Sequence, residues 1–254
     1  MNVWLIVYYL FIFAGTVGFV SSGNERHLLW FLPLIFLSAI PLALWDSLKY
    51  NRLFLAGRVD EAFAELEARE RKNSGKPKAR NTLLLSKAAL FANTGDYEKS
   101  DETLGGIHGQ LDPNGEGMRL GLKAYNALMA GGELTAAREE LVAAMKLIDL
   151  PANHLILANI EEGLGRGAAA ADAVRTYEDS KRSRRLIPGW TMLLVNSKLE
   201  ASFSHYLLGR YYVSSGEEAL AAQHLRLCIQ SNPPGVYGEL SARLLTRLTE
   251  KRDT

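Results

Sequence analysis

Two apolar runs at the start of the chain precede a much longer part in which apolar and charged residues alternate. Residues 3–20 and 28–45 each hold 18 residues without Asp, Glu, Lys or Arg. A helix of this length spans about 27 Å, close to the ~30 Å hydrocarbon thickness of a bilayer. A short polar link, residues 21–27, joins the two runs. The pattern predicts a transmembrane hairpin in residues 1–45.

A secretory signal peptide is the alternative interpretation of the first run. No Lys or Arg precedes this run, so it lacks the basic n-region of such peptides. Basic residues also indicate orientation: Lys49, Arg52 and Arg58 follow the second run, whereas the link carries only Arg26. Because basic residues gather on the cytoplasmic side of membrane proteins, we expect both termini in the cytoplasm. The expected location is a bacterial inner (cytoplasmic) membrane, with the chain an integral protein.

Residues 46–254 carry apolar residues at helical spacing, in stretches separated by glycine. Residues 46–56 contain neither Gly nor Pro, so we expect the second membrane helix to continue directly into the first of these stretches. Five glycines each stand five residues before a small residue, at intervals of 38, 37, 33 and 51 residues. The long last interval indicates an insertion at about residues 180–200. The pairs are Gly57 and Ala62, Gly95 and Ser100, Gly132 and Ala137, Gly165 and Ala170, and Gly216 and Ala221.

The clearest helix-turn-helix copy is residues 203–234. Apolar and small residues recur there at helical spacing on both sides of Gly216, and two prolines end the copy. Small residues at the contact allow the second helix to lie close against the first. The residues that form this pattern are Leu208, Gly209, Tyr212, Ala221, Leu225, Cys228, Pro233 and Pro234.

This order of residues resembles the tetratricopeptide repeat (TPR), and with the weaker copies the resemblance covers about residues 46–234. It implies an α-solenoid, since one helix pair cannot bury its apolar face without stacked neighbours. Three residues depart from the family pattern: Arg69 and Tyr125 replace small residues, and Glu161 stands where an aromatic is usual. Residues 73–80 and 112–117 are polar, turn-rich links between pairs.

The predicted fold class is all-α, with an N-terminal transmembrane hairpin followed by a cytoplasmic solenoid. The solenoid, residues 46–254, holds about five TPR-like helix pairs and a C-terminal capping helix in residues 236–251. This last helix is amphipathic, with one face for the last pair and one for water. Its apolar stripe is Leu240, Leu244, Leu245 and Leu248.

The resemblance also implies a place for a partner. In this family the concave surface, lined by the first helix of each pair, usually holds an extended or helical peptide. Arg and Asn can bond a peptide's backbone or carboxylates, while Leu, Met and Tyr supply apolar contact. Ordinary surface exposure is the alternative for each position. The matching residues are Arg119, Leu122, Asn126, Met129, Leu155, Asn159, Tyr206 and Arg210. The chaperone-binding subset of the family uses a clamp of Lys, Asn and Arg for a C-terminal carboxylate. The positions of this chain that match the clamp are mostly apolar, so that partner is not expected.

The insertion combines a basic run with aliphatic and aromatic residues, and two interpretations are open. Such a segment can bind an anionic membrane surface, here as a second contact with the bilayer. It can also be an exposed basic loop that leads into a lengthened first helix of the last repeat. The candidate residues are Lys181, Arg182, Arg184, Arg185 and Trp190.

Composition argues against several classes of function. Lys and Arg total 29 against 28 Asp and Glu, so we expect no nucleic-acid partner. The single Cys228 lies on an apolar stripe and is expected in the core. The five histidines lack metal-ligand spacing, and no phosphate-binding glycine loop is present. We therefore expect no catalytic residue, metal or cofactor, and no enzyme.

The function expected from these features is that of a membrane-anchored TPR scaffold or adaptor. It would bind a partner protein through its helical-repeat surface at the cytoplasmic face of the membrane. The alternative is an accessory or assembly subunit of a larger membrane protein complex, held mainly through its transmembrane hairpin.

Overall fold

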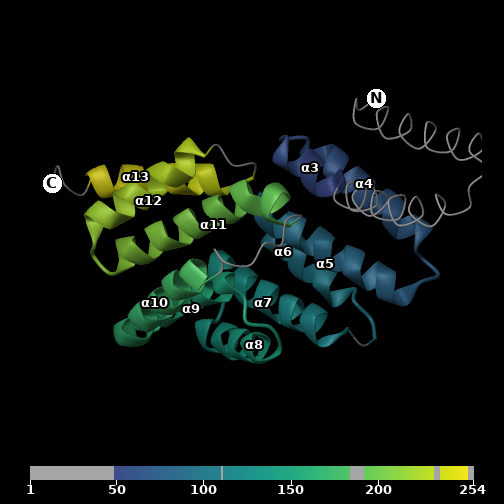
Figure 1. Ribbon diagram of the computed structural model, residues 1–254, viewed down its shortest axis with the longest axis horizontal. Coiled ribbons are helices and arrows are strands. Elements are labelled where there is room, and N and C mark those ends of the chain that lie inside the picture. Colours follow the sequence, from purple (N-terminus) through teal and green to yellow (C-terminus); the bar gives the residue numbers. More distant parts are fainter. Residues whose placement is uncertain (1–48, 110, 184–191, 232–234, 251–254) are drawn as a thin grey trace, which may run out of the picture. The chain divides into compact units, whose positions relative to one another are not determined.

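The computed structural model describes residues 49–109, 111–183, 192–231 and 235–250. These ranges contain eleven helices and no strand, and from Tyr50 onwards they belong to one compact unit (Figure 1). The all-α class is thus confirmed for them. The predicted spans, residues 3–20 and 28–45, lie outside the described residues. None of the described helices is both long and apolar enough to cross a membrane.

The described helices form five consecutive pairs and a single C-terminal helix, a helical-repeat architecture of the α-solenoid kind. The pairs are α3 (Lys49–Leu55) and α4 (Val59–Lys72), α5 (Pro77–Thr94) and α6 (Tyr97–Gly105), α7 (Pro113–Ala130) and α8 (Leu134–Leu147), α9 (Pro151–Gly163) and α10 (Gly167–Ser183), and α11 (Met192–Ser214) and α12 (Glu218–Gln230). The last helix is α13 (Tyr237–Glu250).

A glycine in the left-handed conformation turns the chain between the two helices of every pair. The φ angles of these glycines lie between +74° and +86°, a conformation that glycine adopts without the steric cost of a Cβ. Four of the five glycines are those expected from the sequence. The third assignment was wrong by one residue: Gly131, not Gly132, ends α7 at positive φ. The five turn glycines are Gly57, Gly95, Gly131, Gly165 and Gly216.

The small residue after each turn is buried in the second helix of its pair. Each has at most 1% of its surface exposed, so no volume is left for a larger side chain without moving a helix. The periodic pattern in the sequence therefore marks the places where the helices approach closely. These residues are Ala62, Ser100, Ala137, Ala170 and Ala221.

Three of the first helices begin with proline, at Pro77, Pro113 and Pro151. Proline suits this position because the first N–H groups of a helix have no partner within the helix. Asp112 caps α7 by accepting a hydrogen bond from the Gly115 N–H at 2.7 Å. The expected polar links at residues 73–80 and 112–117 are consequently shorter than predicted, since the helices start inside them.

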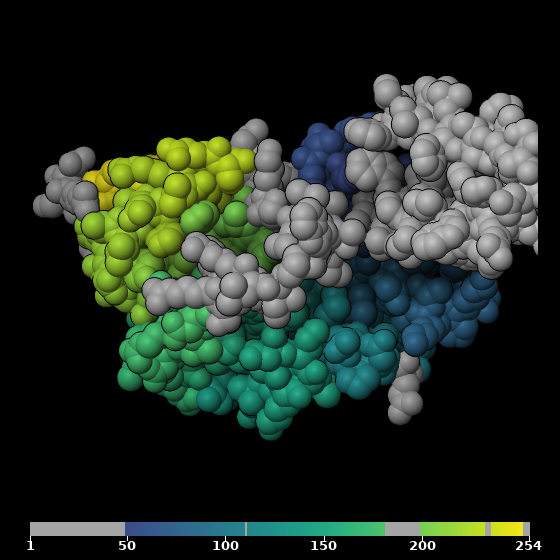
Figure 2. Space-filling model, in the orientation of Figure 1, coloured from purple at the N-terminus to yellow at the C-terminus, as the bar shows by residue number. Residues whose placement is uncertain are grey.

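The odd-numbered helices α5, α7, α9, α11 and α13 pack against one another in sequence order and form one layer. The second helix of a pair packs against the first helix of its own pair, from α5 onwards. The second helices α4, α6 and α8 also pack on the first helix of the next pair, and the fifth pair departs from this third pattern. Its α11 packs on α9, and within the described residues no comparable packing joins α10 to α11. Figure 2 shows these C-terminal helices along the side of the molecule that also carries α9 and α10.

The C-terminal helix packs as expected on the last pair, because Leu248 joins a buried cluster with Ala221 and Leu225 of α12. The residues at the start of this helix also contact the second helix pair. The N–H of Val236 donates a hydrogen bond to the Asn93 carbonyl at 3.1 Å. The chain thus curls until the start of α13 reaches the end of α5 (Figure 1).

Candidate functional site

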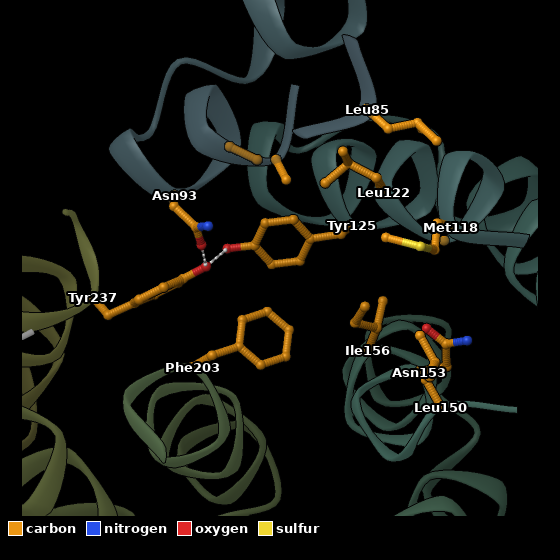
Figure 3. Close-up of a pocket in the computed structure, with 13 residues that line it drawn as sticks. Leu85, Asn93, Met118, Leu122, Tyr125, Leu150, Asn153, Ile156, Phe203 and Tyr237 are labelled. Carbon is orange, nitrogen blue, oxygen red and sulfur yellow. Dashed lines mark hydrogen bonds between the residues drawn. The ribbon is translucent and has the colours of Figure 1, made fainter. Parts of the chain in front are cut away.

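Helices α5, α7, α9 and α11 and the start of α13 line a partly open pocket of about 190 Å³ (Figure 3). Its walls are mainly apolar, with Leu85, Leu122, Ile156 and Phe203 among the lining side chains. Sites for small organic ligands are usually larger, about 300–1,000 Å³. The volume suits one or two apolar side chains. Met118 also lines the pocket and keeps 50% of its surface exposed, so this side chain reaches solvent.

A chain of hydrogen bonds crosses one wall of the pocket and joins three helices. The Tyr125 hydroxyl donates to the Tyr237 hydroxyl at 3.1 Å, and Tyr237 donates to Asn93 Oδ1 at 2.7 Å (Figure 3). Tyr237 is wholly buried, and a buried hydroxyl without a partner would be costly. Because these polar atoms bond to one another, the wall that they form is effectively apolar.

Aromatic rings surround these hydroxyls. Phe203 meets Tyr237 edge-on, with ring centroids 5.7 Å apart, and lies 5.4 Å from the ring of Tyr125. The ring centroid of Tyr206 lies 5.7 Å from that of Tyr237, and Tyr97 meets Tyr125 edge-on at 6.2 Å. Offset and edge-to-face arrangements are favourable for aromatic pairs. We call these five side chains, from α6, α7, α11 and α13, the aromatic cluster.

Burial changes the acidity of the aromatic cluster. Desolvation raises the pKa of Tyr97 to about 12, and it raises the pKa values of Tyr125 and Tyr237 well above the usual range. The charged phenolate is disfavoured away from water. At neutral pH these hydroxyls therefore stay protonated and can act as hydrogen-bond donors.

Four of the eight predicted partner-binding residues lie inside the fold. Asn126, Leu155, Asn159 and Tyr206 each have at most 6% of their surface exposed. Asn126 Nδ2 donates to side chains of α6, Ser100 Oγ at 2.8 Å and Asp101 Oδ1 at 2.7 Å. Asn159 Nδ2 donates to the Leu207 carbonyl of α11 at 3.1 Å. In the described fold these side chains join helices and do not reach a surface.

The other four, Arg119, Leu122, Met129 and Arg210, are partly exposed. Of these, only Leu122 lines the pocket. Arg210 approaches Met129 Sδ with Nη1 at 3.2 Å, and its Nη2 donates to the Leu128 carbonyl at 3.3 Å. Helix α11 of the chain itself therefore covers part of the α7 surface where a partner was expected.

Arg119 lies apart from that contact and forms an ion pair with Glu116 at 2.5 Å. The hydrogen bond from Arg119 is the main cause that lowers the pKa of Glu116. In the candidate membrane-surface segment, Lys181 and Arg182 lie at the end of α10. Arg184, Arg185 and Trp190 lie outside the described residues.

Sequence reasoning missed Asn93, Phe203 and Tyr237 as parts of a site, because their contacts join residues up to 144 positions apart. One feature of the sequence pointed to this site. Tyr125 stands where the TPR pattern has a small residue, and its side chain lines the pocket. A second departure, Glu161, is also explained. Its carboxylate, 3% exposed, accepts a hydrogen bond from Arg138 Nε at 2.5 Å.

Two histidines that the sequence left unconnected also meet. Nδ1 of His205 on α11 lies 3.0 Å from Nδ1 of His224 on α12. In the part of the chain that the structure describes, this pair included, no three His, Cys, Asp or Glu side chains are grouped so that they could hold a metal ion. No model of a known protein family, no curated protein and no solved structure matches this chain.

Proposed function

We propose that this protein is a membrane-anchored, TPR-like scaffold that binds a partner protein at the cytoplasmic face of the membrane. One observation carries the proposal: five helix pairs share a left-handed glycine turn and a fully buried small residue in the second helix. Stacked helix pairs of this kind create extended surfaces that bind peptides or proteins. The apolar runs in residues 3–20 and 28–45 supply the proposed anchor.

The part of the surface that best fits a partner is the pocket and its exposed residue Met118. Apolar groups that fill pockets contribute much of the binding energy in protein interfaces. The partner would insert one or two apolar side chains beside Leu122. Arg119 and Glu116 nearby would contribute polar contacts, which add specificity more than affinity.

A substitution at the exposed residue tests this surface with little risk to folding. Met118→Glu places a charge at the pocket and is expected to reduce capture of partners by the full chain about tenfold, equivalent to about 1.4 kcal/mol. Leu147→Glu on α8 is the matched control, since Leu147 is 41% exposed and does not line the pocket. The readout is quantitative mass spectrometry of proteins that co-purify in mild detergent. Equal capture by both variants and the unchanged chain would remove the proposed surface.

The accessory-subunit alternative gains weight from one observation. Helix α11 covers part of the surface expected to bind a partner, which leaves the membrane hairpin as the other candidate interface. Replacing residues 1–45 with an unrelated two-span hairpin distinguishes the two proposals. The scaffold proposal expects the same partners to be captured, whereas the subunit proposal expects them to be lost.

A further inference from the structure

We propose that His205 and His224 form a binding site for one divalent transition-metal ion, represented by Zn²⁺. The ion would lie between α11 and α12, with water molecules in its remaining coordination positions. Neither histidine lines the pocket, so the proposed metal site is separate from the proposed partner surface and does not rest on it.

The fifth helix pair brings together two imidazole rings that stand 19 positions apart in the sequence. Nδ1 of His205 lies 3.0 Å from Nδ1 of His224, and the ring centroids are 5.3 Å apart with an angle of 34° between the ring planes. Both side chains are partly exposed, so an ion from solvent can reach them.

Neighbouring residues fix the positions of the two rings. Gly209, one helical turn after His205, lets the helices approach closely, because a Cβ there would lie 2.6 Å from Leu225 Cδ2. Leu225 follows His224 directly and is fully buried. The ring of Tyr212 stacks on that of His224, with centroids 5.6 Å apart and planes at 15°. Because both ligands stand on packed helices, the pair is largely preorganised for binding.

The distance between the two nitrogen atoms fits ligation of one ion. Zinc–imidazole bonds are about 2.0–2.1 Å long, so two nitrogens on one ion lie about 2.9 Å apart at a right angle and about 3.3 Å apart at a tetrahedral angle. The observed 3.0 Å falls between these values. Small rotations of the imidazole rings therefore suffice to direct both lone pairs at one ion.

The protonation of the pair is compatible with this change. A neutral imidazole has one nitrogen that donates and one that accepts, so in the ion-free pair one ring donates its Nδ1–H to Nδ1 of the other. With an ion bound, each ring carries its proton on Nε2 and presents the Nδ1 lone pair to the metal. Two coordination bonds then replace one hydrogen bond between α11 and α12.

The ligand set determines which ions are expected. Imidazole nitrogen suits zinc, copper and nickel, whereas magnesium and calcium are bound mainly by oxygen. Within the described residues no third His, Cys, Asp or Glu side chain completes the group. The site should therefore bind its ion reversibly and should not bind magnesium.

Isothermal titration calorimetry of the full chain in mild detergent, made without a polyhistidine tag, tests the proposal. Zinc chloride should titrate to a site of one ion per chain, and magnesium chloride should give no binding heat at this site. His205→Gln and His224→Gln should each weaken zinc binding at least about tenfold, because even changes to groups behind the ligands typically cost 10–100-fold.

His108→Gln is the matched control, since His108 is exposed and lies between α6 and α7. It should leave zinc affinity unchanged, and circular dichroism should show equal helix content in all variants. Unchanged zinc affinity in either His205→Gln or His224→Gln would overturn the proposal. So would an equal loss of affinity in His108→Gln.

A second measurement uses the unchanged chain and therefore does not depend on how the variants fold. Copper(II) should bind the same site at least as tightly as zinc, and it is paramagnetic. Pulsed electron paramagnetic resonance at one equivalent of copper chloride should detect two imidazole rings bound to the ion. Detection of one ring or none would overturn the proposal.

Discussion

The hydroxyl of Tyr125 lies 3.1 Å from the hydroxyl of Tyr237, although 112 positions separate the two residues. The first belongs to the third helix pair and the second begins the C-terminal helix. The Tyr237 hydroxyl in turn donates a hydrogen bond to Asn93 of the second pair. The start of the C-terminal helix therefore contacts both the second and the third helix pair. Asn93, Tyr125 and Tyr237 all line the pocket, so this meeting forms part of its wall.

Removing one hydroxyl tests how much this bond contributes. Tyr237→Phe leaves the buried Tyr125 hydroxyl and the partly buried Asn93 Oδ1 without their partner, so we expect a loss of about 1–3 kcal/mol in the free energy of unfolding. Denaturant unfolding followed by circular dichroism measures it. Tyr211→Phe is the control, since Tyr211 is also buried but lies outside the aromatic cluster, and its loss should stay within about 0.5 kcal/mol. Equal losses would show that the hydroxyl bond has no special weight.

Alkaline pH should destabilise the fold through the aromatic cluster. Tyrosine in an unfolded chain has a pKa near 10, whereas burial raises the pKa of Tyr97 to about 12 and that of Tyr237 still further. The folded state thus keeps protons that the unfolded state releases. The stability that these residues contribute is complete below about pH 10, the pKa of the unfolded state. For Tyr97 it is lost as the pH rises from about 10 through its folded-state pKa of about 12.

Absorbance and circular dichroism recorded together check this behaviour. Tyrosinate absorbance from Tyr97, Tyr125 and Tyr237 should appear together with loss of helix content as pH rises above about 10. In Tyr237→Phe, one buried tyrosine fewer should ionise in this pH range, so the rise in tyrosinate absorbance that accompanies unfolding should be smaller. Full ionisation of all tyrosines while the helix content remains native would contradict the burial described for the aromatic cluster.

Removing Arg138 should cost more stability than removing its partner, the buried carboxylate of Glu161. Arg138→Ala leaves the carboxylate without its 2.5 Å hydrogen bond, although Arg166 remains 3.6 Å away. We expect a loss of about 2 kcal/mol, below the 3–5 kcal/mol for breaking a wholly buried pair, because the Arg138 side chain is 36% exposed.

Replacing the carboxylate with an apolar group gives the contrast. Glu161→Leu should cost less than Arg138→Ala, since the freed guanidinium can turn to water while an apolar group fills the buried site. Unfolding free energies of the two single variants and the double variant give the coupling energy. A coupling energy near zero would mean that the ion pair does not hold α8 to α9.

Gly209 should tolerate no methyl group. An added Cβ would lie 2.6 Å from Leu225 Cδ2 on α12, so Gly209→Ala should lower the free energy of unfolding by about 1–3 kcal/mol through overpacking. Gly105→Ala is the matched control, because a Cβ at this helical glycine would meet nothing within 4 Å. It should be neutral or stabilise by up to about 1 kcal/mol. Thermal unfolding of both variants is sufficient, and a stabilising Gly209→Ala would contradict the close approach of α11 and α12.

The repeat pattern could be predicted from the sequence because it reflects structural requirements within a single helix pair. A left-handed turn needs glycine, and a close approach of two helices needs a small residue a fixed distance later. Both requirements fall within one helix pair, so they leave a signature such as Gly216 and Ala221. The one-residue error at Gly131 arose because two adjacent glycines satisfy the same local pattern.

The candidate site could not be predicted in this way, because its residues come from several helix pairs and from α13. The contact between residues 93 and 237 forms only when the helix pairs have stacked on one another, so it depends on packing along the series of pairs. Leu155 and Asn159 matched the family pattern for a concave surface, yet the structure buries them under α11 because that helix packs on α9.

Helix positions, turns and the amphipathic C-terminal helix thus followed from residue order, since hydrophobic spacing and backbone preferences act over a few residues. Which faces stay open did not follow from it. That was decided by packing between α11, α13 and the earlier helices, where contacts such as Tyr125 with Tyr237 depend on the summed geometry of the whole stack.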